Sequence, residues 1–222
     1  MNFPSRCILT LAYAWSAVAF GASSSGGDIS RVIGSVRVEA GQAARDVSTV
    51  NGSVTVGAAA TADELETVNG SVRIEERAVV ESAETVNGDV TVGEGAEVRE
   101  GIETVNGDVT LRSGVRVGGS VSNVNGDMLL ENATVGGGLE TVNADIRLTT
   151  GSRVAGGIHI EKTNGNGRSW FGKDQPNPRI TVEQGAVVEG PLVFEREVDL
   201  YLAPGVEVPA VQGVQPKRFT LQ

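Results

Sequence analysis

Residues 66–74 read ETVNGSVRI, residues 84–92 read ETVNGDVTV, and residues 103–111 read ETVNGDVTL. Altered copies follow the same plan at 48–56 (STVNGSVTV), 122–130 (SNVNGDMLL) and 140–148 (ETVNADIRL), and 30–38 (SRVIGSVRV) is a degenerate first copy. The shared asparagine recurs in steps of 18 or 19 residues, at Asn51, Asn69, Asn87, Asn106, Asn125 and Asn143. A repeat of this fixed length predicts a solenoid whose units stack on their neighbours.

A shorter period lies within each copy. Apolar or small residues recur every six positions, as at Val56, Ala62, Val68 and Ile74. Six divides 18 three times, so each coil has three short sides, and the six-residue period excludes helices. We therefore predict an all-β, single-domain triangular parallel β-helix with about 18 residues per coil and about eight coils. In this assignment Val68 and its equivalents face the core, whereas the preceding threonines, such as Thr67, line an outer face.

Composition agrees with a narrow core. Aromatic residues make up only 4% of the chain and glycine supplies 30 residues. Small branched side chains can fill such a triangle without aromatic residues. Asn-Gly suits the corners because asparagine tolerates and glycine prefers positive φ, and stacked asparagines can hydrogen-bond along the column.

The formal net charge of −10 excludes some partners. Nucleic-acid binding needs a basic stripe, and electrostatic docking on anionic lipid needs a basic surface. We therefore expect neither partner.

Residues 1–22 differ from the rest. A single arginine, Arg6, precedes an apolar run of 14 residues, Cys7–Phe20, which ends in the small residues Ala17-Val18-Ala19. These features predict a secretory signal peptide, and hence a protein exported to the periplasm, the outer membrane or the exterior. An uncleaved anchor is the alternative, although 14 residues fall short of the roughly 20 that span a bilayer. The chain from residue 23 has no cysteine and no predicted transmembrane segment.

The repeat defines the domain plan. We assign 23–208 to the solenoid and 163–179 (TNGNGRSWFGKDQPNPR) to a protruding loop insertion. The period returns over 180–208, where Phe194 and Tyr201 add bulk that suits a C-terminal cap. Residues 209–222 are expected to form a flexible tail.

The VNGDV-type unit resembles bacterial β-strand-repeat proteins known as putative adhesins. Residues 180–194 (ITVEQGAVVEGPLVF) and 114–121 (GVRVGGSV) are similar to bactofilins, a polymer-forming cytoskeletal family. The two resemblances cover roughly residues 30–208. They imply right-handed coils and, from the bactofilins, end-to-end polymerisation without nucleotide, although a signal peptide does not suit a cytoskeletal role. The period of six also resembles the left-handed hexapeptide acyltransferases.

The sequence does not offer the histidines that enzymes with a comparable repeat use. Hexapeptide acyltransferases use a catalytic histidine, and their carbonic-anhydrase relatives bind zinc through three. This chain has one histidine, His159, between Ile158 and Ile160. Alternation along a strand turns His159 outward. We therefore expect no catalytic residue and no cofactor.

An aspartate column follows the corner in four successive coils, at Asp89, Asp108, Asp127 and Asp145. One interpretation is structural: each carboxylate accepts backbone N–H groups at its own corner. The other is a calcium ladder, because stacked carboxylates suit a hard cation. A glutamate column (Glu66, Glu84, Glu103, Glu140, Glu161) stands beside the threonines and is most simply a solvated face.

Trp170 and Phe171 in the loop are candidates for binding a sugar or a protein, or for covering the coil edge.

The sequence as a whole is compatible with three functions. The first is a non-enzymatic envelope scaffold that self-associates through its coil ends. The second is an adhesin-like module that binds envelope glycan or protein, and the third is an enzyme acting on polysaccharide.

Overall fold

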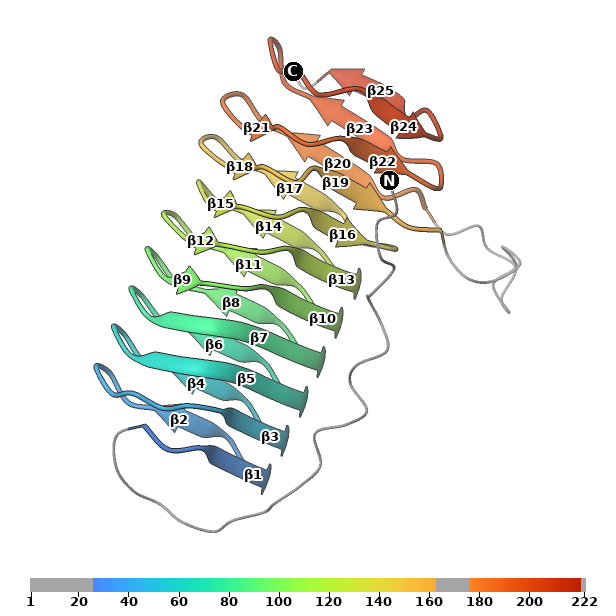
Figure 1. Cartoon of the computed structure of the whole chain (residues 1–222). Coiled ribbons are helices and arrows are strands. Elements are labelled where there is room, and N and C mark those ends of the chain that lie inside the picture. The colour runs from blue at the N-terminus through green and yellow to red at the C-terminus, as the bar shows by residue number, and fades with distance from the viewer. Residues whose placement is uncertain (1–25, 163–175, 221–222) are drawn as a thin grey trace, which may run out of the picture.

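The computed structural model describes residues 26–162 and 176–220, and within them the chain is one elongated stack of parallel β-strands without helices (Figure 1). Each coil has three sides, as the repeat predicts. The first side is a ten-stranded parallel sheet, so the solenoid has about ten turns rather than eight. At about 4.8 Å per turn the stack is about 48 Å long.

The strands of the first side follow one another at coil intervals. They are β2 (Val36–Val38), β4 (Val54–Val56), β6 (Val72–Ile74), β8 (Val90–Val92), β11 (Val109–Leu111), β14 (Met128–Leu130), β17 (Ile146–Leu148), β20 (Arg179–Val182), β23 (Asp199–Leu202) and β25 (Lys217–Thr220).

The second and third sides belong to one sheet, because β5 (Thr61–Asn69) and β7 (Val79–Asn87) run through the corner that other coils break. The second side continues in β9 (Glu97–Val98), β12 (Arg116–Val117), β15 (Thr134–Val135), β18 (Arg153–Val154) and β21 (Val187–Val188). The third side also contains β1 (Ile29–Ile33), β3 (Val47–Asn51), β10 (Ile102–Asn106), β13 (Val121–Asn125), β16 (Leu139–Thr141), β19 (Ile158–Ile160), β22 (Leu192–Phe194) and β24 (Val211–Gly213).

The core is a thin column of small apolar side chains. In one coil Val54 and Val56 point inward from the first side, Ala62 from the second and Leu65 from the third, and all four are buried. Neighbouring coils pair in register, so that Val54 stands over Val72 and Leu65 over Ala83. Each coil therefore buries its apolar positions against the same positions of the next coil.

The inward residue on the third side is threonine rather than valine, which corrects the sequence assignment. Thr49, Thr67 and Thr85 are buried, with at most 4% of their surface exposed, whereas Val50 and Val68 are half-exposed. Side chains alternate along a strand, so once Leu65 faces the core, Thr67 must face it too. A buried hydroxyl needs a partner, and these threonines donate to corner carbonyls of the preceding coil.

Those threonine bonds are short and regular. Thr49 donates to the Gly34 carbonyl oxygen at 3.0 Å, Thr67 to that of Gly52 at 2.9 Å, and Thr85 to that of Gly70 at 3.0 Å.

The Asn-Gly corners depend mainly on close stacking, although Gly126 also has a positive φ of 116°. None of the six column asparagines has a positive φ; the non-glycine residues described with one are Ala59, Arg77 and Asn132. At Gly70, however, an added Cβ would overlap the backbone carbonyl of Gly52 one coil below. Glycine is needed there because the two backbones approach too closely for any side chain.

The C-terminal end differs from the sequence assignment of a tail from residue 209. Strands β24 and β25 pair in parallel with β22 and β23 and so add a further coil beyond 180–208. The ring of Phe219 stacks on Tyr201 with centroids 4.6 Å apart, and the Arg179 guanidinium lies 5.2 Å from the centre of the Tyr201 ring. The apolar columns do not predict β25, because its sequence, KRFT, has charged residues at its first two positions.

The insertion interrupts the stack between β19 and β20. Residues 163–175 lie outside the described residues, and the chain is back in the solenoid at Arg179, which starts β20. There β20 pairs with β17 in the ordinary register, Ile146 beside Ile180. The insertion therefore lengthens one coil without shifting the columns.

Candidate binding face

The six column asparagines form a hydrogen-bonded ladder along the corner between the third and first sides. From Asn69 onward, each Nδ2 donates to the Oδ1 of the asparagine one coil earlier, at distances from 2.9 to 3.1 Å. The last oxygen of the ladder, Oδ1 of Asn143, accepts a hydrogen bond from Nη1 of Arg196 at 2.7 Å. The same guanidinium donates to the Val142 carbonyl oxygen at 3.3 Å. Arg196 thus ends the ladder, and the ladder fixes the corner.

The aspartate column caps backbone groups from coil to coil. Asp89 Oδ1 accepts the Asp108 N–H at 3.0 Å, Asp108 Oδ1 accepts the Asp127 N–H at 2.7 Å, and Asp145 Oδ1 accepts the Arg179 N–H at 2.7 Å. Serines do the same in earlier coils, where Ser35 Oγ accepts the Ser53 N–H at 3.1 Å. The sequence interpretation placed each bond within one corner, whereas the structure places it between neighbouring coils.

The geometry does not favour calcium at the aspartate column. Within residues 26–162 and 176–220 no group of three or more His, Cys, Asp or Glu side chains could hold a metal ion. A shallow depression beside Asp108, Asp127 and Asp145 is lined also by Arg147 and Arg179, which repel a cation. Partial burial, then Asp145 and Asp108, raise the pKa of Asp127, and only the Asp145 backbone N–H opposes them.

Opposite charges alternate between coils on the first and second sides. On the first side Arg37 pairs with Glu75 at 2.9 Å, and on the second Arg99 pairs with Glu81 at 2.6 Å. Further pairs link Arg112 to Glu131, Arg116 to Glu97 and Arg153 to Glu189. Much of the charge on these two sides is therefore paired between coils.

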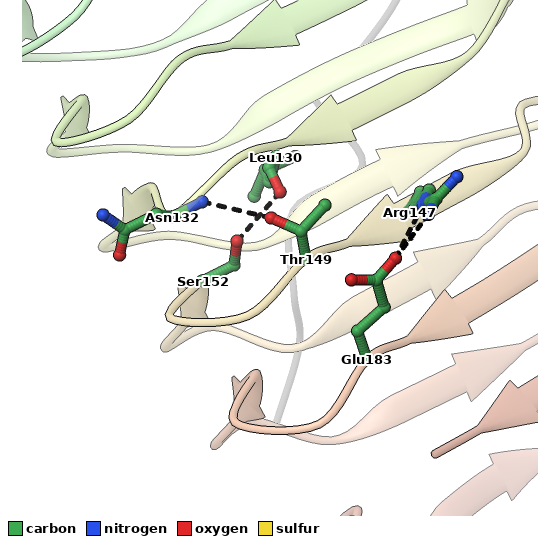
Figure 2. Close-up of polar contacts among 6 residues, drawn as sticks. All are labelled: Leu130, Asn132, Arg147, Thr149, Ser152 and Glu183. Carbon is green, nitrogen blue, oxygen red and sulfur yellow. Dashed lines mark hydrogen bonds and ion pairs between the residues drawn. The ribbon is translucent and has the colours of Figure 1, made fainter. Parts of the chain in front are cut away.

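Figure 2 shows part of the first side and its corner with the second side. Nε and Nη2 of Arg147 donate to one Glu183 oxygen at 2.8 and 2.6 Å. At the corner the buried Ser152 hydroxyl donates to the Leu130 carbonyl at 2.9 Å, and the Asn132 N–H donates to Thr149 Oγ1 at 3.3 Å. The polar groups joined by dashed lines in Figure 2 are therefore used within the fold.

The third side has no such compensation. Its outward positions carry two parallel rows, which we call the glutamate–valine face: Glu66, Glu84, Glu103 and Glu140 in one row, and Val50, Val68, Val86, Val105 and Val124 in the other. Among residues 26–162 and 176–220, no ion pair or hydrogen bond engages these four carboxylates. The valine row is the consequence of the inward threonines.

Stacking in register perturbs these glutamates. Glu66, Glu84 and Glu103 occupy equivalent positions in successive coils. Partial burial, and secondarily the neighbouring carboxylates, raise the pKa of each of the three above its ordinary value. A free carboxylate surrounded by like charges is destabilised, so a cation placed on this row would be favoured.

A groove runs along this face over five successive coils. It is lined by Glu84, Thr85, Glu103, Thr104, Val105, Ser122, Asn123, Val124, Glu140, Thr141, Val142 and Glu161. Its polar groups inside the wall are already bonded: Asn123 Oδ1 accepts the Thr141 hydroxyl at 2.6 Å, and Asn123 Nδ2 donates to the Gly126 carbonyl at 3.0 Å. What the groove offers to a partner is therefore its carboxylates and its valines.

The loop aromatic residues and the single histidine were the other residues considered from the sequence. Trp170 and Phe171 lie outside the described residues. His159 is half-buried on β19, pointing outward between two buried isoleucines, and its Nε2 lies 3.3 Å from a Glu195 oxygen. The glutamate–valine face was missed as a site, because the sequence assignment turned its valines inward.

The chain matches no known protein family, no curated protein and no solved structure. No helix long and apolar enough to cross a membrane occurs in the described ranges.

Proposed function

We propose that this protein is a non-enzymatic β-solenoid scaffold of the bacterial cell envelope whose copies associate end to end. Residues 1–22 carry the features of a secretory signal, which supports an exported location. Bonded side chains fill the corner columns, and the polar groups of the core are satisfied within the fold. This arrangement suits a structural element better than a catalytic one.

The end-to-end arrangement rests on one observation. Among the described residues five large hydrophobic side chains are exposed, and four of them lie in the first or last coil: Val32, Ile33, Val214 and Phe219. Within the described residues, the strands of the first and last coils also have no strand paired to their outer edges. An open edge with exposed apolar side chains favours pairing with another copy, and head-to-tail contacts of this kind build filaments.

The same ends carry charges that weaken such pairing. Arg218 occupies the inward position that Leu200 holds one coil earlier, and Arg31 stands in the inward threonine column beside Thr49. Inward-pointing charges on edge strands oppose pairing. We therefore expect weak association that grows with protein concentration and is strengthened by Arg218→Leu.

Sedimentation velocity and negative-stain microscopy of the chain from Ser23, with calcium and with chelator, test the proposal. We expect filaments or end-to-end dimers in both buffers. Phe219→Ser and Ile33→Ser should reduce association, whereas Leu129→Ser, at an outward position of β14 in the middle of the stack, should not. A monomer at every concentration would exclude the polymer.

A binding module is the second candidate, and the glutamate–valine face is the observation that favours it. A long face with unpaired charge and half-exposed valines is suited to contact an envelope protein. If the protein is monomeric, this function becomes the better one.

A further inference from the structure

We infer that the glutamate–valine face is a docking surface for a basic amphipathic helix of a partner protein. The inference extends the binding role proposed above and does not depend on end-to-end association. It rests on the groove, on the valine row beside it and on the sign of the uncompensated charge.

Charge selects the class of partner. Glu84, Glu103 and Glu140 line the groove without a cation among the described residues. Anionic glycans, nucleic acids and anionic lipid surfaces are repelled by this row. The same face of a second copy carries the same charges, and seven of the 13 arginines in the described residues already pair with glutamates on the other two sides or the corner between them. A cationic partner other than this protein remains.

Spacing selects the form of the partner. Equivalent positions in neighbouring coils lie about 4.8 Å apart along the solenoid axis. Side chains three or four residues apart on a helix are separated by about 5–6 Å, whereas alternate side chains on a strand are about 6.6 Å apart. A helix along the axis can therefore place successive lysines or arginines on Glu66, Glu84 and Glu103, which occupy successive coils, and its backbone needs no bonds from the sheet.

The valine row gives the contact its apolar component. Val105 and Val124 line the groove one strand position beyond the inward Thr104 and Asn123, so the glutamate and valine rows run side by side. A helix with one cationic row and an adjacent apolar row matches both. Recognition of an amphipathic helix by an apolar groove is a recurring mode of peptide binding.

The test uses the purified protein and a synthetic helical peptide with a lysine row and an adjacent leucine row, measured by fluorescence anisotropy. The control peptide has the same composition in scrambled order. We expect the ordered peptide to bind at least about tenfold more tightly than the scrambled one, with affinity that falls as salt increases.

Two variants locate the contact. Glu84→Gln with Glu103→Gln should weaken binding about tenfold, and Val105→Ser should weaken it several-fold. Glu76→Gln with Glu94→Gln removes the same number of charges at exposed corner positions away from the groove and should leave binding unchanged. Circular dichroism of each variant checks that the solenoid is intact.

Three results would overturn the inference. Equal affinity for the ordered and scrambled peptides would show only general attraction to an acidic protein, and equal loss in both double variants would place the contact elsewhere. Displacement of the peptide by millimolar calcium at constant ionic strength would indicate a small-cation site instead. Sedimentation decides the end-to-end proposal separately, so failure of either proposal is distinguishable from failure of the other.

Discussion

The first and third sides of the solenoid come from the same repeat but place polar groups in opposite ways. On the first side apolar residues such as Val72 and Val90 face the core in every coil except the last, where Arg218 takes an inward position, and many outward charges are paired, as in Arg147 with Glu183. On the third side threonine hydroxyls face the core, and within the described residues the four glutamates of the outward row form no ion pair. The first side is therefore complete in itself, whereas the third side leaves charge and apolar surface available.

The difference begins at the corner. Asn-Gly brings the backbones of successive coils together and leaves the glycine carbonyl turned toward the inward threonine. A residue at that position must donate a hydrogen bond, so threonine or asparagine is used and valine moves outward. The exposed valine row thus follows from a requirement of the corner, and the groove follows from the valine row.

Exchanging the inward residues of the two sides should give the largest effect. Val90→Thr on the first side buries a hydroxyl at a fully buried position and should lower the free energy of unfolding by about 2 kcal/mol. Thr85→Val on the third side deprives the Gly70 carbonyl of its hydroxyl donor and should lower that free energy by about 1 kcal/mol. Urea titration of both variants measures the two changes. A neutral or stabilising Thr85→Val would show that the hydroxyl bond is not needed.

The fold class could be predicted from the sequence alone, because the repeat positions recur at a nearly constant spacing. The asparagine steps and the six-residue period fixed three sides, parallel pairing and coil length, and all three are confirmed by the register of the strands. The asparagine hydrogen bonds follow from the same stacking.

The repeat spacing could not predict which side chains of the third side face the core. Thr67 and Val68 are adjacent and either could face inward, so hydrophobicity alone favoured the valine. The decisive fact is the position of the Gly52 carbonyl, which depends on coil stacking. The last coil was missed for a related reason, since Arg218 takes an inward position where an apolar residue is expected.

The unpaired glutamates should make the third side sensitive to pH. The folded pKa values of Glu66, Glu84 and Glu103 are raised, so the folded chain binds more protons than the unfolded chain as pH falls toward 4.5. The free energy of unfolding should therefore increase as pH falls from 7 to about 5, by no more than about 1 kcal/mol for these partly exposed groups.

Two double variants isolate this effect when the slope of the free energy of unfolding against pH is compared between them. In Glu84→Gln with Glu103→Gln the increase on acidification should shrink, and the variant should be more stable than the original chain at pH 7. Glu76→Gln with Glu94→Gln should keep the original slope. Thermal unfolding followed by circular dichroism at several pH values measures it, and an unchanged slope in the first variant would contradict the assignment.

Breaking an ion pair on the first side should have the smallest effect. Glu183→Gln removes the charge that Arg147 contacts with two nitrogens, but the arginine side chain is 63% exposed. Exposed pairs contribute little because water and salt screen them, so we expect a loss of about 0.5 kcal/mol in the free energy of unfolding. The loss should vanish in 1 M salt, as urea titrations at two salt concentrations would show. A loss above about 2 kcal/mol that persists in salt would mean that charge pairing, and not the valine core, holds the first side together.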